Sequence, residues 1–134
     1  MKKGFVTDIE AATLANNRFR HVLYTGRFSQ LVLMCLKPKE EIGEEVHTTV
    51  DQFFRFEEGT GLVVIDGVKH AVKNGSAAVV PAGARHNVIN TSAKNPLRLY
   101  TIYSPPEHID KTVRATKQEA LDQPEEYDGK PTES

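Results

Sequence analysis

Residues 75–90, GSAAVVPAGARHNVIN, hold two short runs of β-forming residues on either side of a turn. Pro81 has a fixed backbone angle and Gly83 tolerates positive φ, so together they can turn the chain between the runs. The turn returns His86 to the second run, in which alternate side chains face the same way. The stretch therefore predicts two strands joined by a turn, with a histidine on one face of the second strand.

From Phe19 onward, the rest of the chain also consists of short strand-like runs separated by turn residues. Further short runs typical of strands lie at 21–24, 29–36, 44–47, 52–56, 62–65, 68–72 and 97–103. Asp66-Gly67 separates two of them and is a strong signal for a tight hairpin, because such a turn needs positive φ. Asn74-Gly75 repeats this chemistry, and residues 58–61 predict a third reversal. Many short strands without long crossovers predict an all-β fold, either an antiparallel sandwich or a closed barrel.

We expect one domain, because 134 residues suffice for a single core. Residues 1–18 are expected to form an N-terminal lead with one irregular turn, and residues 19–110 the barrel. Residues 111–134 are expected to form a short helix and a mobile polar tail. Thr116–Glu119 is typical of a capping box, and Pro124 would end the helix.

The composition argues against several classes of function. A formal net charge of −1 gives no basic field that would attract nucleic acid or an anionic membrane. Residues 31–36 form the most apolar run, which is far too short to span a bilayer, and no apolar leader follows the basic start. Cys35 is the single cysteine, which fits a cytoplasmic location, and we interpret it as a buried core residue rather than a reactive thiol.

Two separated segments carry side chains that bind metals. In the first, Glu45 and His47 are two residues apart on a strand and so point to the same face. A polar loop over 48–51 would let Gln52 face inward on the next strand, and the second segment supplies His86. Two imidazoles, a carboxylate and an amide oxygen suit Mn, Fe, Ni or Zn. With a divalent ion the site stays positive, which favours an anionic small-molecule ligand. A hydrogen-bonded cluster without metal is the alternative interpretation.

Both segments resemble the motifs of the cupin family. Residues 75–90 match the second cupin motif, G-x5-P-x-G-x2-H-x3-N, at every fixed position. The first motif, H-x-H-x4-E-x6-G, keeps its spacing, and its fixed positions here are Glu45, His47, Gln52 and Gly59. Glutamate thus replaces the first histidine, glutamine replaces the glutamate, and Lys39 stands where the motif begins with glycine. Over residues 30–105 the chain resembles a small single-domain cupin of the mannose-6-phosphate-isomerase-like group.

This resemblance implies a jelly-roll barrel, an antiparallel double-stranded β-helix, that holds one metal at the four matched positions. His47 and His86 carry over directly, and Glu45 and Gln52 carry over as oxygen donors. Phosphomannose isomerases likewise mix histidine with amide and carboxylate donors. Because cupins commonly pair through edge strands, the resemblance also implies a homodimer, and the strand over 19–24 is expected to be exposed on a lone barrel.

Two classes of function follow from these observations. The first is a metal-dependent enzyme that acts on a small oxygen-rich molecule, by an isomerase-type or a dioxygenase-type reaction. The alternative is a non-catalytic module that holds a small ligand or the metal itself. The neutral Gln52 modestly favours the second class, because it removes a charged group that could act as a base.

The remaining histidines and tyrosines have no ligand spacing. We expect three histidines at the surface or at strand ends, namely His21, His70 and His108. Tyr100 and Tyr103 fall on opposite faces of one predicted strand, so at most one of them faces the interior.

Overall fold

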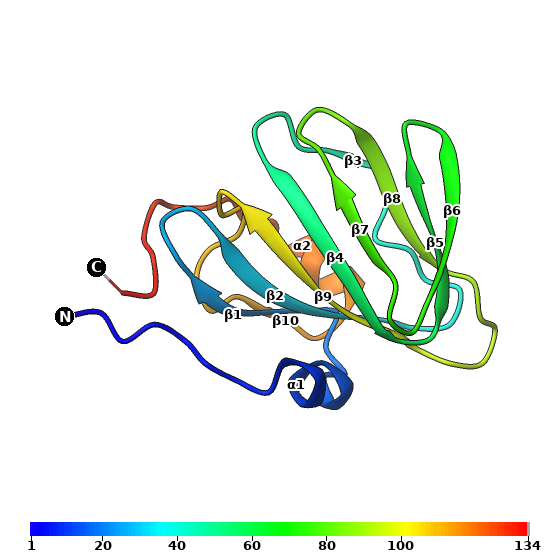
Figure 1. Cartoon of the computed structure of the whole chain (residues 1–134), viewed down its shortest axis with the longest axis horizontal. Coiled ribbons are helices and arrows are strands. Elements are labelled where there is room, and N and C mark those ends of the chain that lie inside the picture. Colours follow the sequence, from blue (N-terminus) through cyan, green and yellow to red (C-terminus); the bar gives the residue numbers. More distant parts are fainter. Residues whose placement is uncertain (134) are drawn as a thin grey trace.

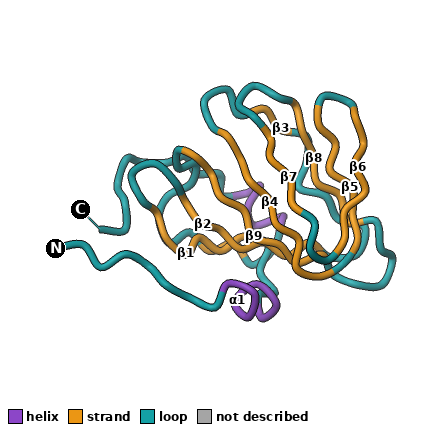
Figure 2. Tube along the Cα trace, in the orientation of Figure 1, coloured by secondary structure: helices purple, strands orange, loops and turns teal. Residues whose placement is uncertain are grey.

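Two antiparallel sheets face each other and enclose the core of the protein (Figure 1, Figure 2). The computed structural model describes residues 1–133. The larger sheet has the strand order β10-β1-β2-β9-β4-β7, and the smaller sheet has the order β3-β8-β5-β6. In chain order the strands are β1 (Arg20–Thr25), β2 (Gln30–Leu36), β3 (Glu45–Val46), β4 (Asp51–Glu58), β5 (Thr60–Ile65), β6 (Val68–Lys73), β7 (Ala77–Val80), β8 (Arg85–Asn90), β9 (Leu97–Ser104) and β10 (Val113–Arg114). Their pairings are antiparallel, so the predicted all-β barrel is confirmed.

The interior of the barrel is apolar at one end and polar at the other. Along β4, Phe54 and Phe56 are fully buried, and Phe56 lies opposite Leu99 of β9. At the other end of β4, Gln52 lies opposite Tyr103, and both are buried. Burial of the apolar end stabilises the fold, whereas each buried polar group at the other end needs a hydrogen bond or a bound ion.

Glycine decides two of the connections between strands. At the β5–β6 hairpin Asp66 and Gly67 have φ angles of 46° and 82°, positive as predicted. Residues 58–61, where the sequence predicts a reversal, carry the chain from β4 in the larger sheet to β5 in the smaller one. Gly59 has a φ of 107° there, and a Cβ at this position would lie 2.6 Å from the carbonyl oxygen of Pro96. The turn residues indicate the bend but not the change of sheet, because a hairpin and a passage between sheets use the same turn residues.

A helix, α1 (Ile9–Ala15), occupies the segment predicted to hold only an irregular turn. The side chain of Asp8 caps it by accepting a hydrogen bond from the N–H of Ala11 at 3.1 Å. Thr13 is buried where the helix meets β2, β4 and β9, and Figure 1 shows α1 on the side of the larger sheet that faces away from the smaller one. So short a helix is marginal alone, and contact with the sheet stabilises it.

The predicted C-terminal helix is present as α2 (Lys117–Asp122). The hydroxyl of Thr116 caps it by accepting a hydrogen bond from the N–H of Glu119 at 3.1 Å, as the capping box predicts. Ala120 packs against the core, and residues of α2 line a cavity together with residues of β1 and β3. Neither helix within residues 1–133 has the length and apolarity that a membrane crossing needs.

The segment after Pro124, predicted to form a mobile polar tail, makes specific contacts with the barrel. The carboxylate of Glu125 is buried, and its Oε1 lies 2.8 Å from Nδ1 of His108. Further along, the N–H of Thr132 donates a hydrogen bond of 2.9 Å to the carbonyl of Thr25. The composition of the tail is polar, but its polar groups have specific partners on the barrel, and these partners fix its course.

Strand β1 is covered over part of its length, contrary to the exposed edge that the sequence predicted. Strand β10 pairs with Arg20 and His21 of β1, so β10 forms this edge of the larger sheet. A short strand at the edge is one way in which proteins limit unwanted pairing between sheets.

Candidate metal centre

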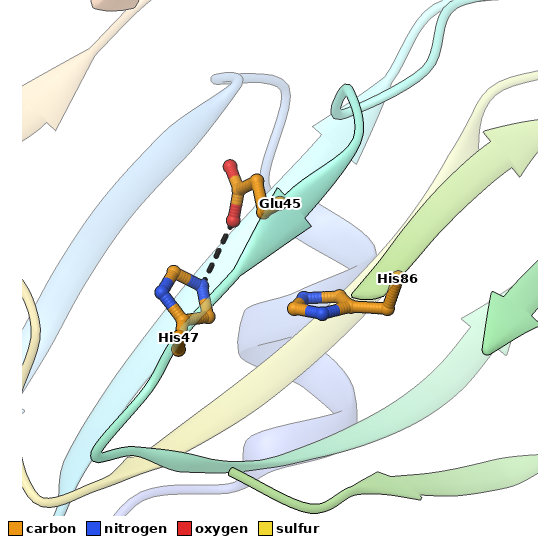
Figure 3. A group of neighbouring side chains, drawn as sticks. All are labelled: Glu45, His47 and His86. Carbon is orange, nitrogen blue, oxygen red and sulfur yellow. Dashed lines mark ion pairs between the residues drawn. The ribbon is translucent and has the colours of Figure 1, made fainter. Parts of the chain in front are cut away.

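Three of the four residues predicted as metal ligands meet at the polar end of the barrel (Figure 3). Glu45 on β3 lies directly opposite His86 on β8, and His47 follows β3. One ligand atom from each of the three side chains lies within 4.8 Å of the others. Nε2 of His47 is 2.9 Å from Oε2 of Glu45, and the two imidazole rings are 5.3 Å apart between centroids. The shared face predicted for Glu45 and His47 agrees with this contact.

Both imidazole rings have Nδ1 turned toward an acceptor. Nδ1 of His86 lies 3.3 Å from the carbonyl oxygen of Ala84, which can only accept a hydrogen bond. Nδ1 of His47 lies 3.5 Å from Oε1 of Glu107. An acceptor at Nδ1 holds the proton there and leaves the lone pair of Nε2 for a metal, which is the usual arrangement around metal-binding histidines. The rings are therefore oriented as ligands require.

Charge at this site is balanced by His47. The carboxylates of Glu107 and then Glu45 raise the pKa of His47 to about 9, although burial opposes this. Burial also disfavours the charge on Glu45, yet the neighbouring His47 lowers the pKa of that carboxyl overall. At neutral pH His47 is therefore a cation, with one ring nitrogen beside each carboxylate. A metal ion at Nε2 would take the place of the proton on that nitrogen.

Gln52, the fourth predicted residue, is held by one end of its amide. It is 2% exposed, and its Nε2 donates a hydrogen bond of 3.0 Å to the hydroxyl of Thr101. Its carbonyl oxygen, Oε1, is buried and has no hydrogen-bond partner among residues 1–133. Tyr103, directly opposite Gln52, has its ring 6.0 Å from that of His47. An unpaired buried acceptor is costly, and a coordinated cation would satisfy it, so this residue fits a metal as well.

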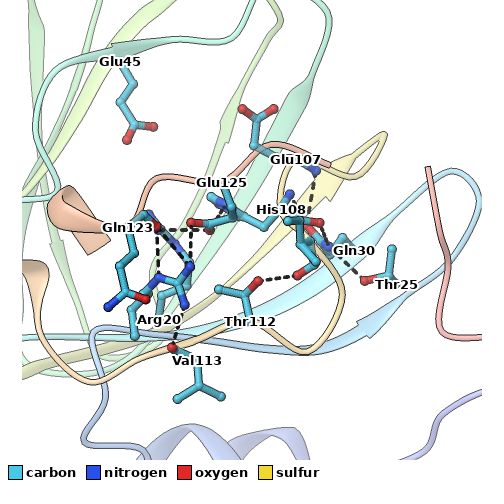
Figure 4. Close-up of polar contacts among 12 residues, drawn as sticks. Arg20, Thr25, Gln30, Glu45, Glu107, His108, Thr112, Val113, Gln123 and Glu125 are labelled. Atoms are coloured by element: carbon cyan, nitrogen blue, oxygen red, sulfur yellow. Dashed lines mark hydrogen bonds and ion pairs between the residues drawn. The ribbon is translucent and has the colours of Figure 1, made fainter. Parts of the chain in front are cut away.

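Two residues around the centre were not predicted from the sequence. Glu107 lies on the loop after β9, and its spacing from His47 in the chain follows no motif. His108, predicted at the surface or at a strand end, lies beside Glu125 (Figure 4) and is buried, with its ring edge-on to that of Tyr103 at 4.9 Å between centroids. Burial lowers the pKa of His108, so it is neutral beside Glu125. The prediction for His108 was wrong because Glu125, in the segment after α2, packs against it. No pattern in the sequence indicates that contact.

Other predictions about polar and sulfur-bearing residues agree with the structure. Tyr103 is buried and Tyr100 on the opposite face is only half-buried. Cys35 is buried, and burial raises the pKa of its thiol, which keeps it unreactive.

Comparisons with known proteins identify relatives over most of the chain. A family model described as "Cupin domain" matches residues 32–103. The uncharacterized protein YrkC of Bacillus subtilis (strain 168) is 48% identical over 125 residues, which cover 89% of this chain and 67% of YrkC. The crystal structure of BH2720 from Bacillus halodurans has a TM-score of 0.88 and 42% identity over 90% of this chain and 96% of that one. TT1209 from Thermus thermophilus has a TM-score of 0.64 and 26% identity, over 75% of this chain and 96% of that one. None of these three names states an activity.

Proposed function

The chain belongs to the cupin family, and on that premise we propose that it binds one divalent transition metal and uses it on a small oxygen-rich substrate. The proposed ligands are four side chains at the polar end of the barrel: Glu45, His47, Gln52 and His86. The closeness of the donor atoms of Glu45, His47 and His86, within 4.8 Å of one another, is the observation that carries this proposal. Mixed nitrogen and oxygen donors favour Mn, Fe, Ni or Zn.

The surroundings of the site favour proton transfer, as in an isomerase-type reaction. A bound metal would polarise a carbonyl or hydroxyl oxygen of the substrate. Burial raises the pKa of Tyr103, so its phenol stays protonated and can donate a hydrogen bond. Glu107, whose carboxylate lies 3.5 Å from Nδ1 of His47, would hold that ring in place for the metal. A dioxygenase-type reaction would in addition need a redox-active metal such as iron.

A non-catalytic binding module is the second candidate function. Gln52 favours it, because a neutral amide stands where the family motif has glutamate. Metal-loaded protein that binds small oxygen-rich molecules without converting them would support the module. Turnover of a carbonyl or enol substrate that is lost in His47→Ala would support the enzyme.

Elemental analysis of freshly purified protein tests the metal site itself. We expect about one equivalent of a transition metal per chain, and a loss of most of it in a His47→Ala/His86→Ala double variant. His70→Ala is the matched control, since His70 is exposed and lies outside the cluster. The proposal would be refuted if wild-type protein held no metal after growth and dialysis with each of the four ions. It would also be refuted if the double variant bound as much metal as wild type.

A further inference from the structure

Arg20 is a buried cation for which the proposed metal centre gives no explanation. It begins β1, faces the interior and is 8% exposed. Its guanidinium makes no hydrogen bond with residues 1–133, and Nε is fully buried without a partner. The nearest carboxylate contact, from Nη1 to Oε1 of Glu125, is 3.6 Å long. A buried charge with unsatisfied donors is expensive, so a ligand is the natural partner for it.

Arg20 lines a cavity that adjoins the candidate metal centre. The cavity has a volume of about 170 Å³ and lies between β1, β3 and α2. Glu45 is part of its wall, so one side chain belongs both to the cavity and to the centre. Whole ligand sites usually occupy about 300–1,000 Å³, and a space of this size therefore fits one end of a ligand.

Two cations and two carboxylates line this cavity, a balance that favours a singly charged anion over a doubly charged one. Lys117 of α2 lines the cavity as a second cation. Glu125 also lines it, but its charge is shared among contacts with His108 at 2.8 Å, Arg114 at 3.4 Å and Arg20. Glu45 and Glu125 would repel a doubly charged phosphate more than a carboxylate. The planar fork of arginine matches a carboxylate with two parallel hydrogen bonds.

We propose that Arg20, assisted by Lys117, binds a carboxylate group of the substrate, so that the substrate's other oxygens lie at the metal centre. The position of the other oxygens at the metal rests on the proposed function. The carboxylate site does not, because Arg20 and Lys117 form it without a metal. The substrate class is therefore a small carboxylic acid that carries a further oxygen function. Arg20 acts here as a binding residue.

Calorimetric titration with succinate, and with neutral succinamide as its matched analogue, tests this assignment. Metal-loaded wild-type protein should bind succinate and not succinamide, and Arg20→Gln should bind succinate about tenfold more weakly or worse. Arg20→Lys should fall between the two, because it keeps the charge and loses the fork. Arg27→Gln is the control, since it removes the same charge from an exposed position. Equal succinate affinity in wild type and Arg20→Gln, or equal binding of succinamide, would overturn the proposal.

A second measurement needs no variant, so a folding defect of Arg20→Gln cannot obscure the answer. In the nuclear magnetic resonance spectrum of wild-type protein, the Nε–H signal of Arg20 should shift on addition of succinate. An unchanged signal at saturation would overturn the proposal. The same titration on the His47→Ala/His86→Ala variant separates the two proposals. If wild-type protein binds no metal and the Arg20 signal still shifts in both proteins, the carboxylate site is supported and the metal centre is refuted. If wild-type protein binds metal and its Arg20 signal does not shift, the carboxylate site alone is refuted.

Discussion

At the scale of the single residue, the environment of His47 is what distinguishes a ligand from an ordinary buried histidine. The ring lies between Glu45 at Nε2 and Glu107 at Nδ1, so one carboxylate belongs to the centre and the other orients the ring from behind. Partners of this second kind commonly change metal affinity by about 10–100-fold when they are removed.

Replacement of Glu107 by glutamine should therefore weaken metal binding by roughly 10–100-fold without abolishing it. The amide keeps the shape of the side chain but loses the charge that holds the proton on Nδ1 of His47. Competition against a chelator of known affinity measures the change. Glu44→Gln is the control, because Glu44 is exposed and pairs with Arg85. Identical affinities in Glu107→Gln and wild type would show that Glu107 does not orient the ring.

Residue-scale prediction from the sequence succeeded where spacing along one strand decides the outcome. Glu45 and His47 have the same parity, and His86 follows a turn whose proline and glycine are recognisable. Glu107 and His108 sit on the loop after β9, and the course of that loop depends on contacts with the tail and not on local pattern. Arg20 carried one usable signal, since its parity matches that of the buried Val22 on β1.

At the scale of the element, the passage of the chain between the two sheets depends on Gly59. Its φ of 107° disfavours any side chain, and a Cβ there would lie only 2.6 Å from the carbonyl oxygen of Pro96. Gly75 offers a matched comparison, because its φ is 88° but nothing lies within 4 Å of a Cβ there. The pair separates backbone strain from steric collision.

Gly59→Ala should lower the free energy of unfolding by about 3 kcal/mol or more, since strain and collision add. Gly75→Ala should cost about 1–2 kcal/mol, from the backbone angle alone. Thermal unfolding followed by circular dichroism measures both. A Gly59→Ala protein as stable as Gly75→Ala would mean that the strands shift readily to admit the methyl group.

Prediction of elements from the sequence was reliable for strands and poor for their connections. Alternating runs such as that of β4 define their own inner face, because one register alone buries Phe54 and Phe56. Turn residues predict that the chain bends but not which sheet it enters next. Residues 58–61 are an example, because the chain passes there from the larger sheet to the smaller one. Helix α1 escaped prediction because its seven residues are stabilised mainly by the sheet beneath them.

At the scale of the whole molecule, the tail links the C-terminal end of the chain to the interior beside the site. Glu125 contacts His108 and Arg20 (Figure 4), and the ring of His108 packs edge-on against that of Tyr103. Burial disfavours the charge of Glu125, but His108 and the neighbouring arginines lower the pKa of its carboxyl overall. This buried contact fixes neutral His108 and ionised Glu125 in the folded protein.

The contribution of His108 and Glu125 to stability should consequently fall as the pH is lowered from 7 to 5, whereas His47, whose pKa is raised to about 9, acts in the opposite direction. The pKa of His108 is lower in the folded protein than its usual 6.5, so the unfolded chain takes up a proton first and is favoured below that pH. Glu125 acts in the same direction at lower pH, because its stabilising charge is lost as the pH falls through its depressed folded pKa. Urea unfolding at both pH values measures the loss, and His108→Gln should show a smaller one. An equal loss in the two proteins would contradict this assignment.

One wall of the cavity beside the centre is contributed by α2 and the segment after it, outside both sheets. The four proposed donor residues all precede α2 in the chain, so a change in α2 or in the segment after it leaves the donors themselves unchanged. A change in this segment should therefore alter which molecules fit the cavity while the proposed metal ligands stay the same. Exchange of residues 117–133 for those of a related protein should therefore change which small acids bind, and titration with succinate measures the change.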